Sequence, residues 1–146
     1  MPRSLQGDLT VIFRIGQLYF AERLAPLGLG SWQRNYIVHV CRSPGISQEG
    51  LAKVLYVNKS TVARQLAALE EAGFVRRQPS ADDARVLEIY PTERAEAALP
   101  ELRAARREWE ALLTEGIAPE EREALGAALA KLRERAAAWA EEERDE

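Results

Sequence analysis

The chain has 146 residues, a single cysteine and a formal net charge of −3 at pH 7. Its length suits one domain, or a small domain with additional oligomerising helices. A hydrophobic content of 47% argues against wholesale disorder. The lone cysteine excludes an internal disulfide and argues against a zinc site. The sequence has no apolar run of the roughly 18 residues that span a membrane and no signal peptide at its start, so we expect a cytoplasmic protein.

The charge is distributed unevenly along the chain. Residues 1–91 carry eleven Lys and Arg against eight Asp and Glu, a net charge of +3. Residues 92–146 carry nine against fifteen, a net charge of −6. Because the local sign of the charge governs the partner, the first part of the chain remains compatible with a polyanion.

Two helices are expected in the first 45 residues. Apolar residues recur at helical spacing from Leu5 to Leu24 and are followed by a stretch rich in Pro and Gly, which ends that helix. Ser31 has a side chain suited to cap a second helix. The residues expected to share the apolar face of the second helix are Trp32, Tyr36, Ile37, Val40 and Cys41.

Residues 47–72 predict two short helices joined by a tight turn. Ser47 and Asn58 are expected to cap the first and the second of them. Helical spacing assigns to the core Leu51, Val54 and Leu55 in the first helix and Val62, Leu66 and Leu69 in the second. The outward face of the second helix then has no carboxylate before Glu70, which suits a surface that meets phosphate.

A β-hairpin with a long polar loop is expected after these helices, with strands near residues 74–78 and 85–90. Together the elements form a winged helix-turn-helix. A cation near the tip of such a wing can enter a narrow minor groove, where the potential is most negative. Arg85 lies two residues after Asp83, and we expect the carboxylate to hold the guanidinium through a charge-assisted hydrogen bond.

The C-terminal part predicts two further helices. Thr92 caps the first, in which Pro100 is expected to produce a kink. Gly116 closes that helix, and Pro119 suits the first position of the last one. The last helix spaces apolar residues with a period of 3.5, which favours packing against another helix of the same chain or of a second copy. These residues are Leu125, Leu129, Leu132, Ala136 and Trp139.

The second helix of the pair can read base edges. Arg64 can pair with guanine in bidentate fashion and Gln65 with adenine. Ser60, Thr61 and Lys59 lie near the positive helix N-terminus and can bind phosphates. The alternative for this face is an ordinary solvated helix surface.

The run SQEGLAKVLYVNKSTVARQLAALEEAGFVRR, followed by DDARVLEIYPTERA, resembles the MarR family of bacterial transcriptional regulators. The resemblance extends over essentially the whole chain, and its most specific part is Asp83-Ala84-Arg85. It implies a mainly α fold with a small β-hairpin wing. The winged helix-turn-helix would occupy residues 31–91, between dimerisation helices in residues 1–30 and 92–146.

The resemblance also implies a homodimer that binds a pseudo-palindromic site in double-stranded DNA, usually represses transcription and often releases DNA when a small aromatic or phenolic acid binds. The residues expected to contact DNA are Gln48, Lys59, Ser60, Thr61, Arg64, Gln65, Arg76, Arg77, Asp83 and Arg85. Those expected in the dimer interface are Leu5, Leu9, Leu125, Leu129, Leu132 and Trp139.

A pocket for a flat organic ligand is expected on the first two helices, because aromatic walls with a few polar groups suit such a ligand. Its candidate residues are Phe13, Gln17, Trp32, Tyr36 and His39. The alternative is that they are core residues joining the two helices. Cys41 is expected to be a buried small hydrophobe rather than a redox sensor.

The sequence gives no reason to expect an enzyme, a metal or a cofactor. It has no phosphate-cradling Gly-rich loop, no metal-ligand cluster and no Ser/His or Cys/His pair at suggestive spacing. Two other classes of function remain open. One is a winged-helix module that binds a protein and not DNA, and the other is a small-molecule carrier or sensor.

Overall fold

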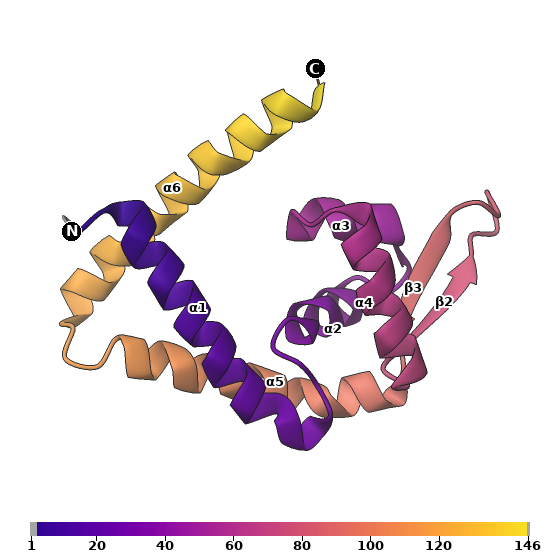
Figure 1. The fold of residues 1–146 in the computed structure, drawn as a ribbon, viewed down its shortest axis with the longest axis horizontal. Coiled ribbons are helices and arrows are strands. Elements are labelled where there is room, and N and C mark those ends of the chain that lie inside the picture. The colour runs from indigo at the N-terminus through magenta and orange to yellow at the C-terminus, as the bar shows by residue number, and fades with distance from the viewer. Residues whose placement is uncertain (1–2, 146) are drawn as a thin grey trace. The chain divides into compact units, whose positions relative to one another are not determined.

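The structure is a computed structural model that describes residues 3–145. It is mainly helical and contains one small antiparallel sheet (Figure 1). Two compact units divide the chain, one extending to Trp109 and the other beginning at Glu110. In chain order the elements are α1 (Leu5–Leu24), η1 (Ala25–Leu27), α2 (Gln33–Arg42), β1 (Ile46–Ser47), α3 (Gln48–Leu55), α4 (Lys59–Glu71), β2 (Val75–Pro79), β3 (Leu87–Pro91), α5 (Glu93–Leu113) and α6 (Pro119–Asp145).

Three helices begin at the caps that the sequence predicts. Ser47 Oγ accepts a hydrogen bond from the backbone N–H of Gly50 at 2.9 Å. Asn58 Oδ1 accepts one from Thr61 at 2.8 Å, and Thr92 Oγ1 accepts one from the residue three positions later at 3.3 Å. Each bond satisfies an N–H group that the first turn of a helix leaves without a partner.

The predicted cap of α2 is wrong. Trp32, and not Ser31, occupies the N-cap position, and its side chain caps nothing. The side chain of Gln33 instead reaches back toward the preceding turn, where its Oε1 accepts a hydrogen bond from the backbone N–H of Gly30 at 2.9 Å. The turn before α2 is therefore closed by a residue of the helix itself.

The predicted hairpin is present, but the sheet has a third strand. β3 lies between β2 and the two-residue strand β1 in the order β1-β3-β2, and both pairings are antiparallel. Ile46 pairs with Ile89, and Arg77 pairs with Ile89 from the other side. Figure 1 shows that the loop joining β2 and β3 projects away from the helices. β1 anchors the start of α3 to the base of this wing.

The core of the first unit contains the apolar face that was predicted for α4. Val62, Leu66 and Leu69 are fully buried, as is Leu51 of α3. The prediction for Val54 is wrong, because 47% of that residue is exposed. The helix-turn-helix thus buries one narrow stripe of each helix and leaves the remaining faces to solvent.

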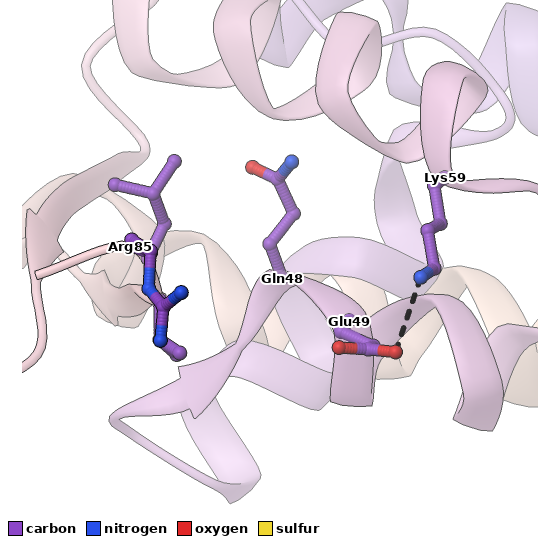
Figure 2. A pocket seen from close by; sticks show the side chains of 6 residues that line it. Gln48, Glu49, Lys59 and Arg85 are labelled. Carbon is purple, nitrogen blue, oxygen red and sulfur yellow. Dashed lines mark ion pairs between the residues drawn. The ribbon is translucent and has the colours of Figure 1, made fainter. Parts of the chain in front are cut away.

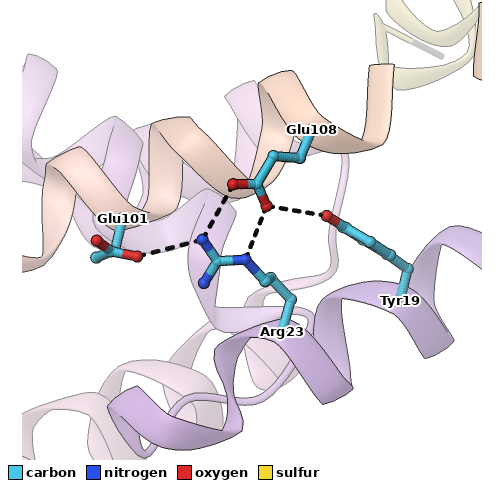
Figure 3. Close-up of polar contacts among 4 residues, drawn as sticks. All are labelled: Tyr19, Arg23, Glu101 and Glu108. Atoms are coloured by element: carbon cyan, nitrogen blue, oxygen red, sulfur yellow. Dashed lines mark hydrogen bonds and ion pairs between the residues drawn. The ribbon is translucent and has the colours of Figure 1, made fainter. Parts of the chain in front are cut away.

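A polar network joins α1 to α5 within the first unit (Figure 3). Arg23 forms ion pairs with Glu108 at 2.9 Å and with Glu101 at 3.2 Å. Tyr19 Oη donates a hydrogen bond to Glu108 at 3.3 Å, and its ring stacks on Trp109 at a centroid distance of 5.0 Å. The hydrogen bond from Arg23 lowers the pKa of the Glu108 carboxyl and raises the pKa of the guanidinium. These contacts hold the C-terminal half of α1 against α5.

The second unit consists of the end of α5, a turn and α6. Gly116 closes the turn with φ of +79°, a conformation that favours glycine, and α6 begins at Pro119 as predicted. Arg122 donates hydrogen bonds to the carbonyl oxygens of Ile117 and Thr114 at 2.9 and 2.8 Å. α5 is continuous through Pro100, and the kink expected there stays a prediction. Within residues 3–145, no helix combines the length and the apolar character that crossing a bilayer requires.

Candidate nucleic-acid interface

The first turns of α4 present a polar surface. Lys59, Ser60 and Arg64 are exposed, because the apolar stripe of the helix faces the core. Asn58 Oδ1 organises this end by accepting hydrogen bonds from the N–H of Thr61 and from Ser60 Oγ at 2.8 and 2.9 Å. Arg64 Nη2 lies 3.4 Å from Thr61 Oγ1. The helix thus offers donors and one flexible guanidinium to a partner.

The start of α4 is free of acid in the sequence but not in space. Lys59 Nζ lies 3.1 Å from a carboxylate oxygen of Glu49, which belongs to the first turn of α3 (Figure 2). The hydrogen bond from Lys59 lowers the pKa of the Glu49 carboxyl. Glu49 was not among the predicted site residues, because ten positions separate it from Lys59. The local charge at this end of α4 is therefore balanced.

A hollow of about 170 Å³ brings together predicted residues from three segments. Gln48 comes from α3, Lys59 from α4 and Arg85 from the loop of the wing. Figure 2 shows the four polar side chains around this hollow. Among the described residues, Oε1 of Gln48 has no hydrogen-bond partner, although it is buried. Such an acceptor is available to a ligand.

The wing loop holds its arginine as expected. Asp83 Oδ1 accepts hydrogen bonds from the backbone N–H and from Nε of Arg85 at 3.0 and 3.1 Å, and Oδ2 accepts one from Nη2 at 3.2 Å. These bonds lower the pKa of the Asp83 carboxyl. The side chain of Arg85 nevertheless remains 91% exposed. The guanidinium is therefore both oriented and accessible.

The two arginines of β2 are engaged within the fold. Arg77 is partly buried and pairs with Glu70 near the end of α4 at 3.2 Å. Its backbone N–H also donates to Glu70, at 3.0 Å. Arg76 is exposed, lies over the ring of Tyr90 at 4.7 Å and donates a hydrogen bond to Gln78. Arg77 thus ties the wing to α4.

The five residues predicted for a ligand pocket line three different hollows. Phe13, Trp32 and Tyr36 line a hollow of about 580 Å³. Gln17 shares a second, of about 370 Å³, with Phe13, whereas His39 lines a third, of about 280 Å³. The five side chains thus line separate hollows of the chain, and their role in ligand binding stays a prediction.

The largest of these hollows reaches the start of α4. Besides the three aromatic side chains, it is lined by the turn between α3 and α4 and by residues of α4 itself. The turn residue Tyr56 has φ of +54°, which is uncommon for a residue with a Cβ. The residues that sequence reasoning missed here are Asn35, Leu55, Tyr56, Val57, Asn58, Thr61 and Gln65. Five of them belong to the predicted turn or to the predicted DNA-facing side of α4, but none signals a ligand.

The chain is similar to regulators of transcription over most of its length. A sequence profile of the MarR family matches residues 37–87. Over 107 residues the chain is 32% identical to YybA of Bacillus subtilis (strain 168), an uncharacterized HTH-type transcriptional regulator, and the alignment covers 73% of this chain and 71% of that protein. The chain belongs to the MarR family.

Solved structures of MarR proteins share the fold. A crystal structure of MarR, 31% identical in sequence, superposes with a TM-score of 0.89 and covers 97% of this chain and 98% of its own. A Listeria monocytogenes protein described as a MarR family transcriptional regulator, 26% identical, was crystallised with a 26-mer DNA. It has a TM-score of 0.85, with 94% of this chain and 91% of that chain covered. The mainly α winged helix-turn-helix predicted from the sequence is thus confirmed.

Two potentially reactive side chains, His39 and Cys41, lie on α2. Burial, and then the charge of Arg42, lowers the pKa of His39. Burial raises the pKa of the Cys41 thiol, and Glu96 adds to this effect while Arg103 opposes it. Cys41 packs against the core, as expected for a small hydrophobe. Among the described residues, no three His, Cys, Asp or Glu side chains are grouped as a metal site would need.

Proposed function

We propose that two copies of this MarR family regulator bind a pseudo-palindromic operator in double-stranded DNA and repress transcription from it. The observation that carries the proposal is the convergence of Gln48, Lys59 and Arg85 on one hollow beside the exposed face of α4. A duplex would contact the segments of these three residues together. The helices α3 and α4 would lie at the major groove, and the wing loop would lie at its edge. Because DNA is the proposed ligand, we expect the protein to act in the cytoplasm.

Each part of this surface has a distinct role in the proposal. Arg64 and Gln65 would read base edges in the major groove, and Lys59, Ser60 and Thr61 would bind phosphates. Arg85, held by Asp83, would enter the minor groove. Arg76 is exposed and can reach a phosphate, whereas Arg77 acts by fixing the wing to α4 through Glu70.

Apolar side chains that a single chain leaves in water support the homodimer. On α1, Leu5 and Leu9 are 60% and 37% exposed. On α6, 63% of Trp139 is exposed, and the leucines of the 3.5-residue seam are exposed as well. Apolar stripes of this kind mark contacts between proteins, and the period of 3.5 matches helix pairing. A dimer would hold two α4 helices about one DNA turn apart, roughly 34 Å.

We also propose that a small aromatic acid releases the DNA by binding in the hollow of about 580 Å³. Trp32 and Tyr36 can stack against such a ligand. Thr61 and Gln65 line the same hollow from α4, so an occupant would touch the helix that reads DNA. Such a ligand releases DNA only if it binds the DNA-free conformation of the protein more tightly than the DNA-bound conformation.

Selection of binding sites from random duplexes tests the proposed DNA binding. We expect enrichment of two inverted half-sites, with centres separated by about 10 base pairs or a multiple of that spacing. Recovery of no preferred sequence, or of one asymmetric site, would contradict the proposal. The parent protein and an Arg64→Ala variant are selected in parallel, since the variant should lose preference at one position of each half-site.

A displacement titration tests the effector. Salicylate added to the operator complex should release labelled DNA from the parent protein but not from Trp32→Ala, which removes one wall of the hollow. Benzyl alcohol, an aromatic ligand without charge, serves as the control compound. Equal release from both proteins would exclude this hollow. Tight salicylate binding with no DNA affinity would instead favour a small-molecule sensor.

A further inference from the structure

Between α2 and α5 lies a groove that is lined by five arginines. Its volume is about 280 Å³, and both helix segments that form it belong to the first unit. No Asp or Glu is among the residues that line it. The charged or titratable residues of the lining, named here the arginine groove, are Arg34, His39, Arg42, Arg103, Arg106 and Arg107.

Three of these arginines lack a carboxylate partner. Within residues 3–145, Arg42, Arg103 and Arg107 form neither an ion pair nor a side-chain hydrogen bond. Arg107 is near enough to Glu108 to contribute to the lowered pKa of that carboxyl, but Glu108 is bonded to Arg23. Arg34 and Arg106 also line the groove, and Arg34 donates a hydrogen bond to Asn35 Oδ1 at 3.2 Å. Five arginines thus line one groove on a chain whose net charge is −3, and like charges repel one another.

We propose that the arginine groove binds a small anion carrying several negative charges, of the class of organic phosphates and polycarboxylates. Guanidinium groups recognise phosphate and carboxylate oxygens through paired, charge-assisted hydrogen bonds. The groove, with a volume of about 280 Å³, is close to the lower end of the range for small-molecule sites, roughly 300 Å³, and leaves too little room for a duplex. It also differs from the aromatic hollow, since no aromatic side chain lines it.

His39 lies in the wall of the groove and can report the anion. The charge of Arg42 acts on His39, and the same groove is lined by Arg34 on α2 and by Arg103, Arg106 and Arg107 on α5. An anion bound among them would favour the protonated imidazole and raise its pKa. His39 is the single histidine of the chain, so the imidazole signals of an untagged protein belong to it without further assignment.

Pyrophosphate is the first probe, and its binding is measured without DNA. Titration of the His39 imidazole by NMR, with and without pyrophosphate at matched ionic strength, should show a raised pKa. Calorimetry should show saturable binding that citrate competes for and sodium chloride does not. An unchanged His39 pKa, together with no saturable heat, would overturn the proposal whatever the protein does with DNA.

A matched pair of double variants locates the site. R42Q/R103Q removes one cation from each wall, whereas R3Q/R14Q removes the same charge from residues outside the groove. We expect pyrophosphate to bind R42Q/R103Q at least about tenfold more weakly, because paired charge-assisted bonds are lost. R3Q/R14Q should bind like the parent. Equal weakening in both variants would show only a general charge effect and would contradict the proposal.

The competing explanation is that the groove contacts the DNA backbone. In that case R42Q/R103Q would bind the operator more weakly with a shallower salt dependence, and pyrophosphate would neither saturate nor shift His39. That result would refute the anion site and leave DNA binding intact. Conversely, pyrophosphate binding that is lost in R42Q/R103Q would stand even if no operator were found.

Discussion

Glu49 and Lys59 form an ion pair at the end of α4 that is proposed to face DNA, with 3.1 Å between the carboxylate oxygen and Nζ. Both side chains are largely exposed, at 63% and 76%. A DNA phosphate that approaches Lys59 must therefore compete with the Glu49 carboxylate for the same ammonium group. An exposed pair of this kind contributes below about 1 kcal/mol, so it can lower DNA affinity without preventing binding.

Replacing Glu49 by Gln should strengthen operator binding. Lys59 would become available to a phosphate and one repulsive charge would disappear, so we expect a dissociation constant about three- to fivefold lower at low salt. The slope of log K against log salt should become steeper by about 0.9, the value for one further phosphate contact. Fluorescence anisotropy at several salt concentrations measures both quantities.

Glu22→Gln is the control for this charge change, because Glu22 is an exposed acid of α1 away from α4. It should leave the salt slope unchanged. If both variants gain the same affinity, the gain comes from net charge alone. The ion pair between Glu49 and Lys59 would then have no role at the interface.

Arg64→Ala should weaken operator binding by about 1–3 kcal/mol and relax the preference at one base pair of each half-site. The guanidinium is exposed and, among the described residues, bonds to the side chain of Thr61 alone, with 3.4 Å to Oγ1, so truncation disturbs no core packing. Binding to a series of single-base operator variants reveals the position. An Arg14→Ala variant of α1 controls for the lost charge, and loss of affinity without loss of preference would mean that Arg64 contacts only phosphate.

The wing separates two effects of charge. Arg85→Ala should weaken binding at the operator flanks. The slope of log K against log salt should become shallower by about 0.9, the value for one phosphate contact. Asp83→Asn keeps the arginine but removes the bidentate bond that orients it, so affinity should fall while the slope stays near that of the parent. Footprinting compares the flanks directly. If Asp83→Asn bound more tightly than the parent, the aspartate would oppose the wing contact rather than organise it.

Local chemistry made several parts of the fold predictable. Ser47 and Asn58 cap helices because a short side-chain oxygen can reach an N–H group two or three residues ahead. Gly73 adopts φ of +82° after α4, where a Cβ is disfavoured. The pair Asp83 and Arg85 spans only two positions. In each case the partner lies within a few residues, so the sequence contains the whole interaction.

Contacts between distant segments were not predictable in this way. Ile46 and Ser47 become a strand only because they pair with β3 more than 40 residues later. Glu49 meets Lys59 because of the angle at the turn between α3 and α4. The predicted pocket residues lie on two helices at suitable spacing, but their side chains open into different hollows. Spacing places residues on a face and does not show what the face packs against.

The network between α1 and α5 should contribute a pH-dependent part of the stability. The folded-state pKa of Glu108 lies below its ordinary value of 4.5, chiefly because of Arg23. A depressed carboxyl pKa stabilises the fold above the unfolded-state value, and the stabilisation is lost as pH falls through the folded-state pKa. Glu108→Gln should therefore lower the melting temperature more at pH 7 than near pH 3. Thermal unfolding followed by circular dichroism at several pH values measures the difference.

Other carboxyls with lowered pKa values also lose their contribution in acid, so only the difference between the variant and the parent is informative. Glu93→Gln, also on α5 but not bonded to Arg23, is the comparison variant. A difference for Glu108→Gln that is the same at both pH values would show that the ion pair with Arg23 contributes nothing measurable.

We propose above that two copies of the chain bind one duplex through α4 and the wing. Sedimentation velocity of the full-length protein with a selected operator tests it most directly, with the parent and an Arg64→Ala/Arg85→Ala variant run side by side. We predict one duplex bound to two parent chains, and a variant that remains a dimer but leaves the duplex unbound at the same concentration. A complex with one chain per duplex, or a variant that binds as the parent does, would contradict the account.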